Sequence, residues 1–201
     1  MSGRDWFDRF VADGPGYAAH RVTLAEMQAL LLKAGRGAGL PLGHAQDLSA
    51  LAPLLMSDPQ LLAMAVAALD SAHRPARLEG TDEHAVVEAA EVLMAGPVVV
   101  DALVAGAKRV VLHNMDWPLL LWPYLAHAQV VYGQCVALTA EGKGTVMITP
   151  ASRDTLDTFP PPGPVPDVIM QRLNGFAAKT YVPATEASRA AGAGAGLTDN
   201  D

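Results

Sequence analysis

The segment HNMDWP, residues 113–118, combines side chains capable of chemistry with a favourable place in the chain. It follows a predicted strand and precedes a predicted helix, and ligands of mixed folds gather beyond the carboxyl ends of strands. His113 could act as a general acid or base, and Asn114 could donate a hydrogen bond. The alternative is structural: Asp116 would cap the next helix and Trp117 would anchor the core, and caps are common at such junctions.

The C-terminal stretch TYVPATEASR, residues 180–189, holds a second group of candidates. Five of its side chains can donate or accept hydrogen bonds: Tyr181, Thr185, Glu186, Ser188 and Arg189. The planar guanidinium of Arg189 suits a carboxylate or phosphate, and Glu186 is a second candidate proton carrier beside His113. This pattern predicts a small anionic metabolite as ligand, bound where the tail folds back over residues 113–118.

The glycine-rich end GAGAGLTDND leaves two interpretations open. Composition alone describes a loose linker, because repeated Gly-Ala units favour a flexible chain. Glycines also let a backbone pass close to a ligand or another chain, where a Cβ would clash.

Metal and cofactor motifs are absent from the sequence. His44 and Asp47 share a helix face, but two ligands do not make a metal site, so a surface pair is expected. His127 is expected as a partner of a helix C-terminus or as a half-exposed core residue. Cys135 is the only cysteine, which excludes an intrachain disulfide, and its apolar setting predicts a buried, inert thiol. No glycine-rich phosphate-binding loop with the required spacing occurs, and we predict neither a metal nor a cofactor.

Charge and hydropathy exclude two classes of partner. The net charge is −7 over 201 residues and no basic stripe occurs, so no nucleic-acid partner is expected. The longest apolar stretch, PLLLWPYLA, is too short to span a bilayer, and the N-terminus lacks the apolar region of a secretory signal. We therefore expect no membrane partner and a cytoplasmic location.

The first half of the chain is predicted to be helical. After an irregular lead-in over residues 1–21, a helix begins at the capping box of Thr23 and Glu26 and ends in GRGAGLPLG. Further helices are expected over 44–56, bent at Pro53, and from Pro59 through the apolar LLAMAVAALD. A last helix is expected from a Thr81 cap to Gly96 and Pro97, which makes about four helices in the half that spans residues 22–96.

The half over residues 97–181 is predicted to contain a small sheet. PVVVDALVAG fits either a strand or a helix, while KRVVLHN is a strand and a helix kinked by Pro123 follows it. VVYGQCVALT and TVMIT flank the turn-forming AEGKG as a hairpin, and the proline-rich stretch 160–166 leads into a helix over DVIMQRLNGFAAKTY. The expected fold is a single α+β domain: a helical bundle, then a small mixed sheet with packed helices and a Gly-rich terminal segment over 182–201.

Three stretches carry a resemblance to an uncharacterised bacterial family of proteins of similar length, classed as a domain of unknown function. They are LAEMQALLLKAGRGAGLPLGHAQDL, DWPLLLWPYLA and TYVPATEASRAAGAGAGLTDND. The terminal stretch resembles a family signature, which implies an ordered, functional tail. The chain departs from the family where members look more like W-G-x-A-E-E, because His44, Gln46 and Asp47 stand there. The overlapping segment EMQALLLKAGRGAGLPLGHAQDLSALAPLL is also similar to the N-terminal helices of the malate/L-lactate dehydrogenase type that lacks a Rossmann fold.

The sequence thus leaves two hypotheses for function. One is an enzyme or binder of a small anionic metabolite, with a site near the C-terminal segment. The other is a non-catalytic interaction or accessory subunit that uses the tail. The Ala- and Leu-rich helices would suit such a subunit, and it could form a homo-oligomer.

Overall fold

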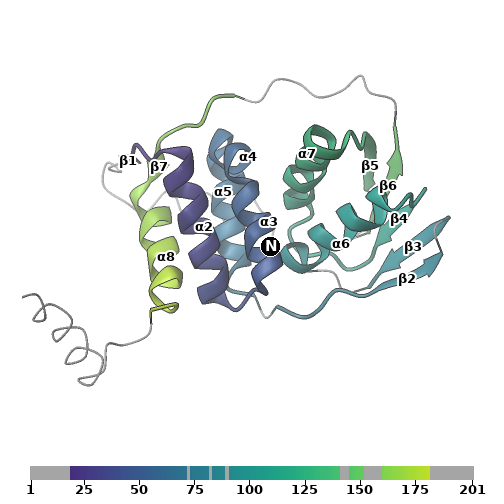
Figure 1. Ribbon diagram of the computed structural model, residues 1–201, viewed down its shortest axis with the longest axis horizontal. Helices are drawn as coiled ribbons and strands as arrows, with labels where there is room; N and C mark the ends of the chain where they lie inside the picture. Colours follow the sequence, from purple (N-terminus) through teal and green to yellow (C-terminus); the bar gives the residue numbers. More distant parts are fainter. Residues whose placement is uncertain are drawn as a thin grey trace, which may run out of the picture.

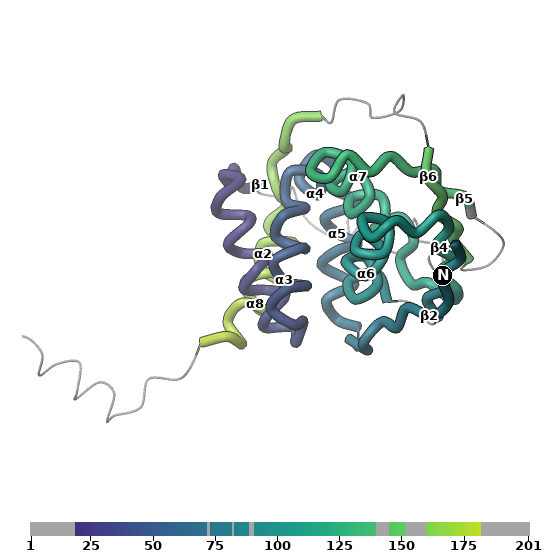
Figure 2. Tube along the Cα trace, turned by 45° about the vertical axis from the view of Figure 1, so that its right-hand side comes forward, coloured from purple at the N-terminus to yellow at the C-terminus, as the bar shows by residue number. Residues whose placement is uncertain are grey.

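Helices occupy one end of the molecule and a sheet the other (Figure 1). The computed structural model describes residues 19–71, 73–81, 83–88, 91–140, 145–151 and 160–181. Its helices are α2 (Leu24–Ala38), α3 (Leu42–Ala50), α4 (Ala52–Ser57), α5 (Pro59–Ala68), α6 (Val92–Val104), the short 3-10 helix η1 (Pro118–Leu120), α7 (Leu121–Tyr132) and α8 (Asp167–Ala178). Helix α8 packs against α2, and α2 against α3, although α8 lies far away in the sequence. Figure 2 shows α6 and α7 between this bundle and the sheet.

The sheet has five strands in the order β2-β3-β4-β6-β5. They are β2 (Leu78–Thr81), β3 (His84–Val87), β4 (Val110–Leu112), β5 (Val136–Ala140) and β6 (Val146–Pro150). Strands β3 and β4 pair in parallel and the other neighbours are antiparallel. The parallel pair needs a crossover connection, which α6 supplies while packing on β4. The predicted α+β fold is confirmed, as are the strand at residues 110–112 and the β5–β6 hairpin, although residues 130–132 of its first predicted strand belong to α7.

A second, two-stranded sheet joins the start of the described chain to the segment before α8. Strand β1 (Ala19–His20) pairs with β7 (Val165–Pro166), so residues 19 and 20 are not part of an irregular lead-in. The His20 ring lies 2.7 Å from the Asp167 carboxylate, and Arg172 of α8 pairs with Asp70 beyond α5. Contacts between distant segments therefore hold α8 in place on the bundle.

The capping box of α2 forms as predicted. The backbone N–H of Glu26 donates to Thr23 Oγ1 at 3.2 Å, and the backbone N–H of Thr23 donates to Glu26 Oε2 at 2.8 Å. These bonds satisfy two donors that have no partner within the helix. The Thr23 hydroxyl also donates to Glu26 Oε2 at 2.7 Å, and this bond, followed by that of the Thr23 N–H, lowers the pKa of the Glu26 carboxyl. The helix ends at Ala38, with Gly39 as its C-cap, inside the predicted glycine-rich stretch.

Thr23→Ala is expected to lower the melting temperature by about 2–4 °C, because one N–H of the first turn loses its acceptor. Glu26→Gln is the matched control, since glutamine still offers an oxygen to the Thr23 N–H and should cost less. Thermal unfolding followed by circular dichroism measures both variants. A Thr23→Ala protein that melts with the wild type would show that this box does not stabilise the fold.

The helix predicted between Thr81 and Pro97 is wrong. Strands β2 and β3 pair as a hairpin over residues 78–81 and 84–87, in which Ala85 and Val87 are buried and alternate with outward positions, the period of a strand. Helix α6 begins only at Val92 and continues through Pro97, which was expected to end a helix. The run PVVVDALVAG, which fits either a strand or a helix, thus lies largely in helix α6, because contacts with α3, α7 and β4 bury this helix on several sides.

Three smaller predictions also need correction. The helix expected over 44–56 is two helices, which begin after Pro41 and are separated at Leu51 rather than bent at Pro53. Pro123 lies in the first turn of α7, where its missing N–H removes no bond within the helix. Cys135 is only partly buried, because it follows the end of α7 and lies outside β5.

The core is one cluster of buried apolar residues that extends from the bundle to the sheet. Its largest fully buried side chains include Met27, Leu31, Leu55 and Ile148. Among the helices of the described residues, none is both long and apolar enough to cross a bilayer.

Candidate functional site

A pocket of about 60 Å³ opens where α3, α6 and α7 meet, and we name it the α3–α6–α7 pocket. Its lining residues are Asp47, Leu51, Pro97, Val100, Asp101, Tyr124, His127 and Tyr132. Helix α3 brings Asp47, α6 brings Asp101, and α7 brings Tyr124 and His127 on the same face, three residues apart. Polar groups from three helices thus converge over an apolar floor, the usual composition of a small-molecule site.

Asp47 lies at the rim of this pocket, and its pKa is raised above the ordinary value of 3.8. The largest cause is burial of the carboxyl against protein, which penalises its charged form. The residue as a whole keeps more than a third of its surface exposed, so this burial is partial. The Asp101 charge also raises the pKa of Asp47, whereas His44 and His127 lower it.

The pKa of His127 is shifted the opposite way, below its ordinary value of 6.5. Burial disfavours the imidazolium, and the negative charge of Asp47 opposes this effect without overcoming it. The pKa of an acid and that of a base in one pocket are therefore brought closer together, and the charge of each group acts on the pKa of the other.

Tyr124 forms the buried part of the pocket wall. The residue is 3% exposed, and its hydroxyl has no hydrogen-bond partner among the described residues. Burial raises the pKa of the phenol, and so does the Asp47 charge, which places the hydroxyl on the acidic side of the pocket. A buried hydroxyl with no partner is costly in a folded protein and needs an explanation.

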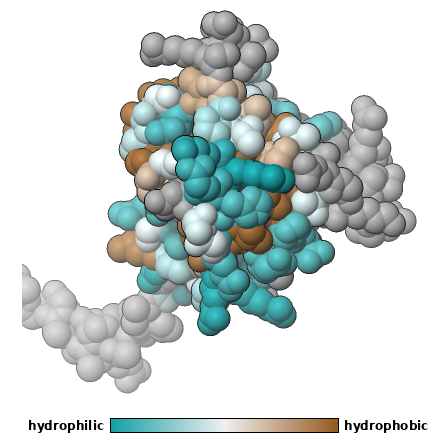
Figure 3. All heavy atoms as spheres, turned by 90° about the vertical axis from the view of Figure 1, so that its right-hand side faces the viewer, coloured by the Kyte–Doolittle hydropathy of each residue, from teal (hydrophilic) through white to brown (hydrophobic). Residues whose placement is uncertain are grey.

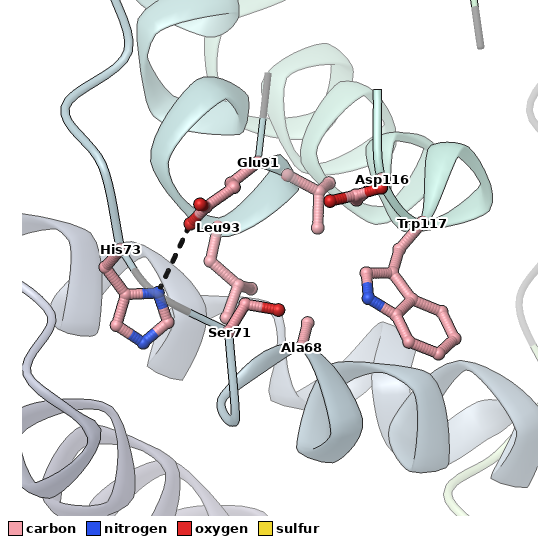
Figure 4. A pocket seen from close by; sticks show the side chains of 8 residues that line it. Ala68, Ser71, His73, Glu91, Leu93, Asp116 and Trp117 are labelled. Atoms are coloured by element: carbon pink, nitrogen blue, oxygen red, sulfur yellow. Dashed lines mark ion pairs between the residues drawn. The ribbon is translucent and has the colours of Figure 1, made fainter. Parts of the chain in front are cut away.

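A second, smaller cavity lies beside the junction that the sequence singled out (Figure 4). Its volume is about 10 Å³, room for about one water molecule, and Asp116 and Trp117 contribute to its wall. His73 and Glu91 both line it and lie next to each other, with 3.8 Å between His73 Nδ1 and Glu91 Oε2 (Figure 4). The His73 side chain is 6% exposed, and neither ring nitrogen forms a hydrogen bond of good geometry.

His73 is expected to make stability depend on pH. Its pKa is lowered from 6.5 because burial disfavours the charged ring, while Glu91 and the Leu69 carbonyl act in the opposite direction. The unfolded chain therefore binds a proton more readily than the folded one. The stability contributed by neutral His73 is full above pH 6.5 and is lost as the pH falls through the lower pKa of the folded state.

Below pH 6.5, we expect the melting temperature of His73→Gln to fall less steeply with decreasing pH than that of the wild type. His84→Gln is the control, since His84 is exposed in β3, and it should follow the wild-type curve. Equal pH slopes for His73→Gln and the wild type would contradict the expected contribution of His73.

The residues predicted from the sequence are not brought together in either pocket. His113 is half-exposed after β4, with Nδ1 3.4 Å from Thr145 Oγ1 and Nε2 4.0 Å from Glu88 Oε1. Asn114 is exposed, and Tyr181 lies after α8, at the opposite end of the molecule from β4 (Figure 1). The other predicted site residues lie outside the described residues: Thr185, Glu186, Ser188 and Arg189.

The prediction that Asp116 caps the next helix is wrong. Trp117, not Asp116, is the N-cap of η1, and no side chain caps this helix. Trp117 and Asn114 are the described non-glycine residues with positive φ, at 55° and 52°. Such a backbone is unusual for a bulky residue. Asp116 instead forms an isolated parallel bridge with Glu91, which ties the junction to the start of α6.

Sequence reasoning noted Asp47 and His127 separately but missed Asp101, Tyr124 and Tyr132. One signal was available: Tyr124 and His127 share a helix face inside an otherwise apolar helix. Among the described residues, no three His, Cys, Asp or Glu side chains are placed to share a metal ion. No family model, curated protein or solved structure matches this chain, so its function is argued from the pocket itself.

Proposed function

We propose that this protein binds a small polar molecule in the α3–α6–α7 pocket and exchanges a proton with it through Asp47 and His127. The observation that carries the proposal is the opposite displacement of the pKa of Asp47 and that of His127 within one pocket. Titratable groups perturbed by burial and by a specific charged partner are typical of functional sites.

The direction of the two shifts suits proton exchange. A general acid or base works best when its pKa is close to the pH at which it operates. Burial moves the pKa of Asp47 up, towards neutral pH, whereas it moves that of His127 down, which favours a neutral imidazole that can accept a proton. Either group can then hold or release a proton when a ligand enters.

The remaining lining residues would hold and orient the ligand. Leu51 and Pro97 are buried and give an apolar floor, while the Tyr124 hydroxyl offers a hydrogen bond that the described protein does not use. A polar ligand that satisfied this hydroxyl would remove the cost of leaving it without a partner.

A blocking substitution tests whether ligands use this pocket. Val100 lies on its wall, and Val104 lies one turn further along α6 and is exposed. We expect polar fragments that bind the wild type, detected by ligand-observed NMR, to lose binding in Val100→Phe and to keep it in Val104→Phe. Fragments that bind both variants equally, or a wild type that binds none, would contradict the proposal.

Proton exchange has a separate test. The affinity of a pocket ligand should change with pH in the wild type, and the change should be smaller in His127→Gln and Asp47→Asn. Glu79→Gln is the control, since Glu79 is exposed in β2. Asp58→Asn would not serve, because Asp58 caps α5. Identical pH profiles in all four proteins would exclude Asp47 and His127 as proton carriers.

A second function is favoured by a different observation. Exposed apolar residues lie at the end of α7 and on β5, an edge strand of the five-stranded sheet: Val130, Val131, Tyr132 and Leu138. An unpaired edge with apolar side chains can receive a partner strand. On the sheet end of the molecule, hydrophilic and hydrophobic residues are interspersed among the coloured atoms (Figure 3). The accessory-subunit hypothesis therefore remains a proposal, with self-association as its first test.

Light scattering after size exclusion measures this association. If the surface of α7 and β5 forms a homo-oligomer, the particle formed by Val130→Lys should have a lower mass than that formed by the wild type. Lys33→Ala, an exposed change on α2, should not. A wild type that stays monomeric at high concentration would count against self-association.

A further inference from the structure

We infer that the α3–α6–α7 pocket takes a small primary or secondary amine in its cationic, protonated form. This inference rests on the proposed function and deepens it by naming the class of ligand. It follows from the charges at the rim of the pocket, the buried hydroxyl in its wall and the aromatic rings beside them.

The charges at the rim have one sign. Asp47 and Asp101 line the pocket, and no Lys or Arg is among its lining residues. Within the described part of the chain, neither carboxylate has an ion pair, and Asp101 acts on Asp47 as a like charge. A cation between them would relieve this repulsion, whereas a carboxylate or phosphate would add to it.

His127 does not counter this preference. Burial holds its pKa below the ordinary value, so the ring is neutral at neutral pH and adds no positive charge to the pocket. The neutral ring keeps one nitrogen as a hydrogen-bond acceptor, which an ammonium N–H can use.

Tyr124 is the independent observation that points to a ligand with N–H groups. Its side chain is buried, its hydroxyl has no partner among the described residues, and it lies near enough to Asp47 for that charge to act on the phenol. An ammonium group placed between the two residues could donate one N–H to the Tyr124 hydroxyl oxygen and another to the Asp47 carboxylate. The rings of Tyr124 and Tyr132 add a favourable surface for a cation.

The prediction of an anionic metabolite concerned a different arrangement. It relied on Arg189, which lies outside the described residues, and on a site beside residues 113–118. The lining of the α3–α6–α7 pocket is negatively charged, whereas Arg189 is positively charged. Binding of an amine in this pocket is therefore independent of binding of an anion elsewhere.

Four small probes test the inference: ethylammonium, tetramethylammonium, ethanol and acetate, at matched ionic strength. The readout is the NMR shift of the His127 ring protons, assigned by comparison with His127→Gln. We expect ethylammonium to shift these signals at the lowest concentration, tetramethylammonium to need more because it lacks N–H donors, and acetate to have no effect.

Variants of the wall separate charge from hydrogen bonding. Asp47→Asn combined with Asp101→Asn should weaken ethylammonium binding about tenfold or more, because two attractive charges are removed. Tyr124→Phe should weaken ethylammonium but leave tetramethylammonium unchanged, which a general unfolding effect would not do. Glu79→Gln, on the exposed strand β2, should bind like the wild type.

Three results would overturn the inference. If ethanol or acetate shifts the His127 signals at a lower concentration than ethylammonium, the pocket binds a ligand but not an amine, and the proposed function survives. If the double Asn variant binds ethylammonium as tightly as the wild type, the carboxylates do not recognise it. Failure of every probe, together with failure of the fragment test on Val100→Phe, would remove both the inference and the proposed function.

Discussion

Gly37→Ala is expected to be among the most destabilising single changes in this protein, lowering the free energy of unfolding by about 3 kcal/mol. A Cβ at position 37 of α2 would lie 1.8 Å from the backbone oxygen of Phe176 in α8. That oxygen belongs to the main chain of a packed helix, so the clash can be relieved only by moving α2 and α8 apart. The separation would loosen the packing of buried Leu173 and Phe176.

Gly175→Ala is the matched control for Gly37→Ala. Gly175 lies in α8, next to Phe176, but a Cβ there meets no atom within 4 Å. Alanine also favours a helix over glycine by about 1 kcal/mol, so this variant should be as stable as the wild type or more so. Chemical denaturation measures both proteins, and similar midpoints for the two would refute the close approach of α2 and α8.

Gly96→Ala should combine a loss of stability of about 2 kcal/mol with a change in the α3–α6–α7 pocket. The added Cβ would lie 2.6 Å from two ring carbons of Tyr124. That ring is buried and cannot swing into solvent, so α6 and α7 must separate or the tyrosine must tilt. Either movement displaces the Tyr124 hydroxyl and with it one wall of the proposed ligand site.

Gly43→Ala in α3 provides the control, because a Cβ at position 43 meets nothing within 4 Å. It should keep the wild-type stability and the response of the His127 ring protons to ethylammonium, whereas Gly96→Ala should lose both. Denaturation and the NMR titration are run on the same samples. A Gly96→Ala protein with wild-type stability and ligand response would contradict the packing of α6 on α7.

The elements that could be predicted are those whose signals lie within a few residues. The capping box of α2 depends on Thr23 and Glu26 alone, and the hairpin β5–β6 on a turn between two apolar runs. Helix α8 follows the proline-rich stretch as expected, and α5 begins at Pro59. Local hydrogen bonds and turn preferences determine such features whatever the rest of the chain does.

The errors occur where one local pattern fits two structures. Thr81 followed by acidic residues is a good helix start, yet residues 84–87 form a strand, of which residues 85–87 pair with β4. Pro97 is a good helix end, yet the apolar residues around it are buried in the middle of α6. In both places the burial gained from distant partners outweighs the local preference, which is a weak one.

The sequence by itself determined the α+β class, the capped start of α2 and the hairpin. Only the tertiary structure decided that Asp47, Asp101, Tyr124 and His127 share one pocket. The reason is geometric, because these residues come from three helices and their spacing along the chain carries no information about how those helices pack. Their pKa shifts arise from that packing as well, since burial is a property of the assembled helices and not of any segment alone.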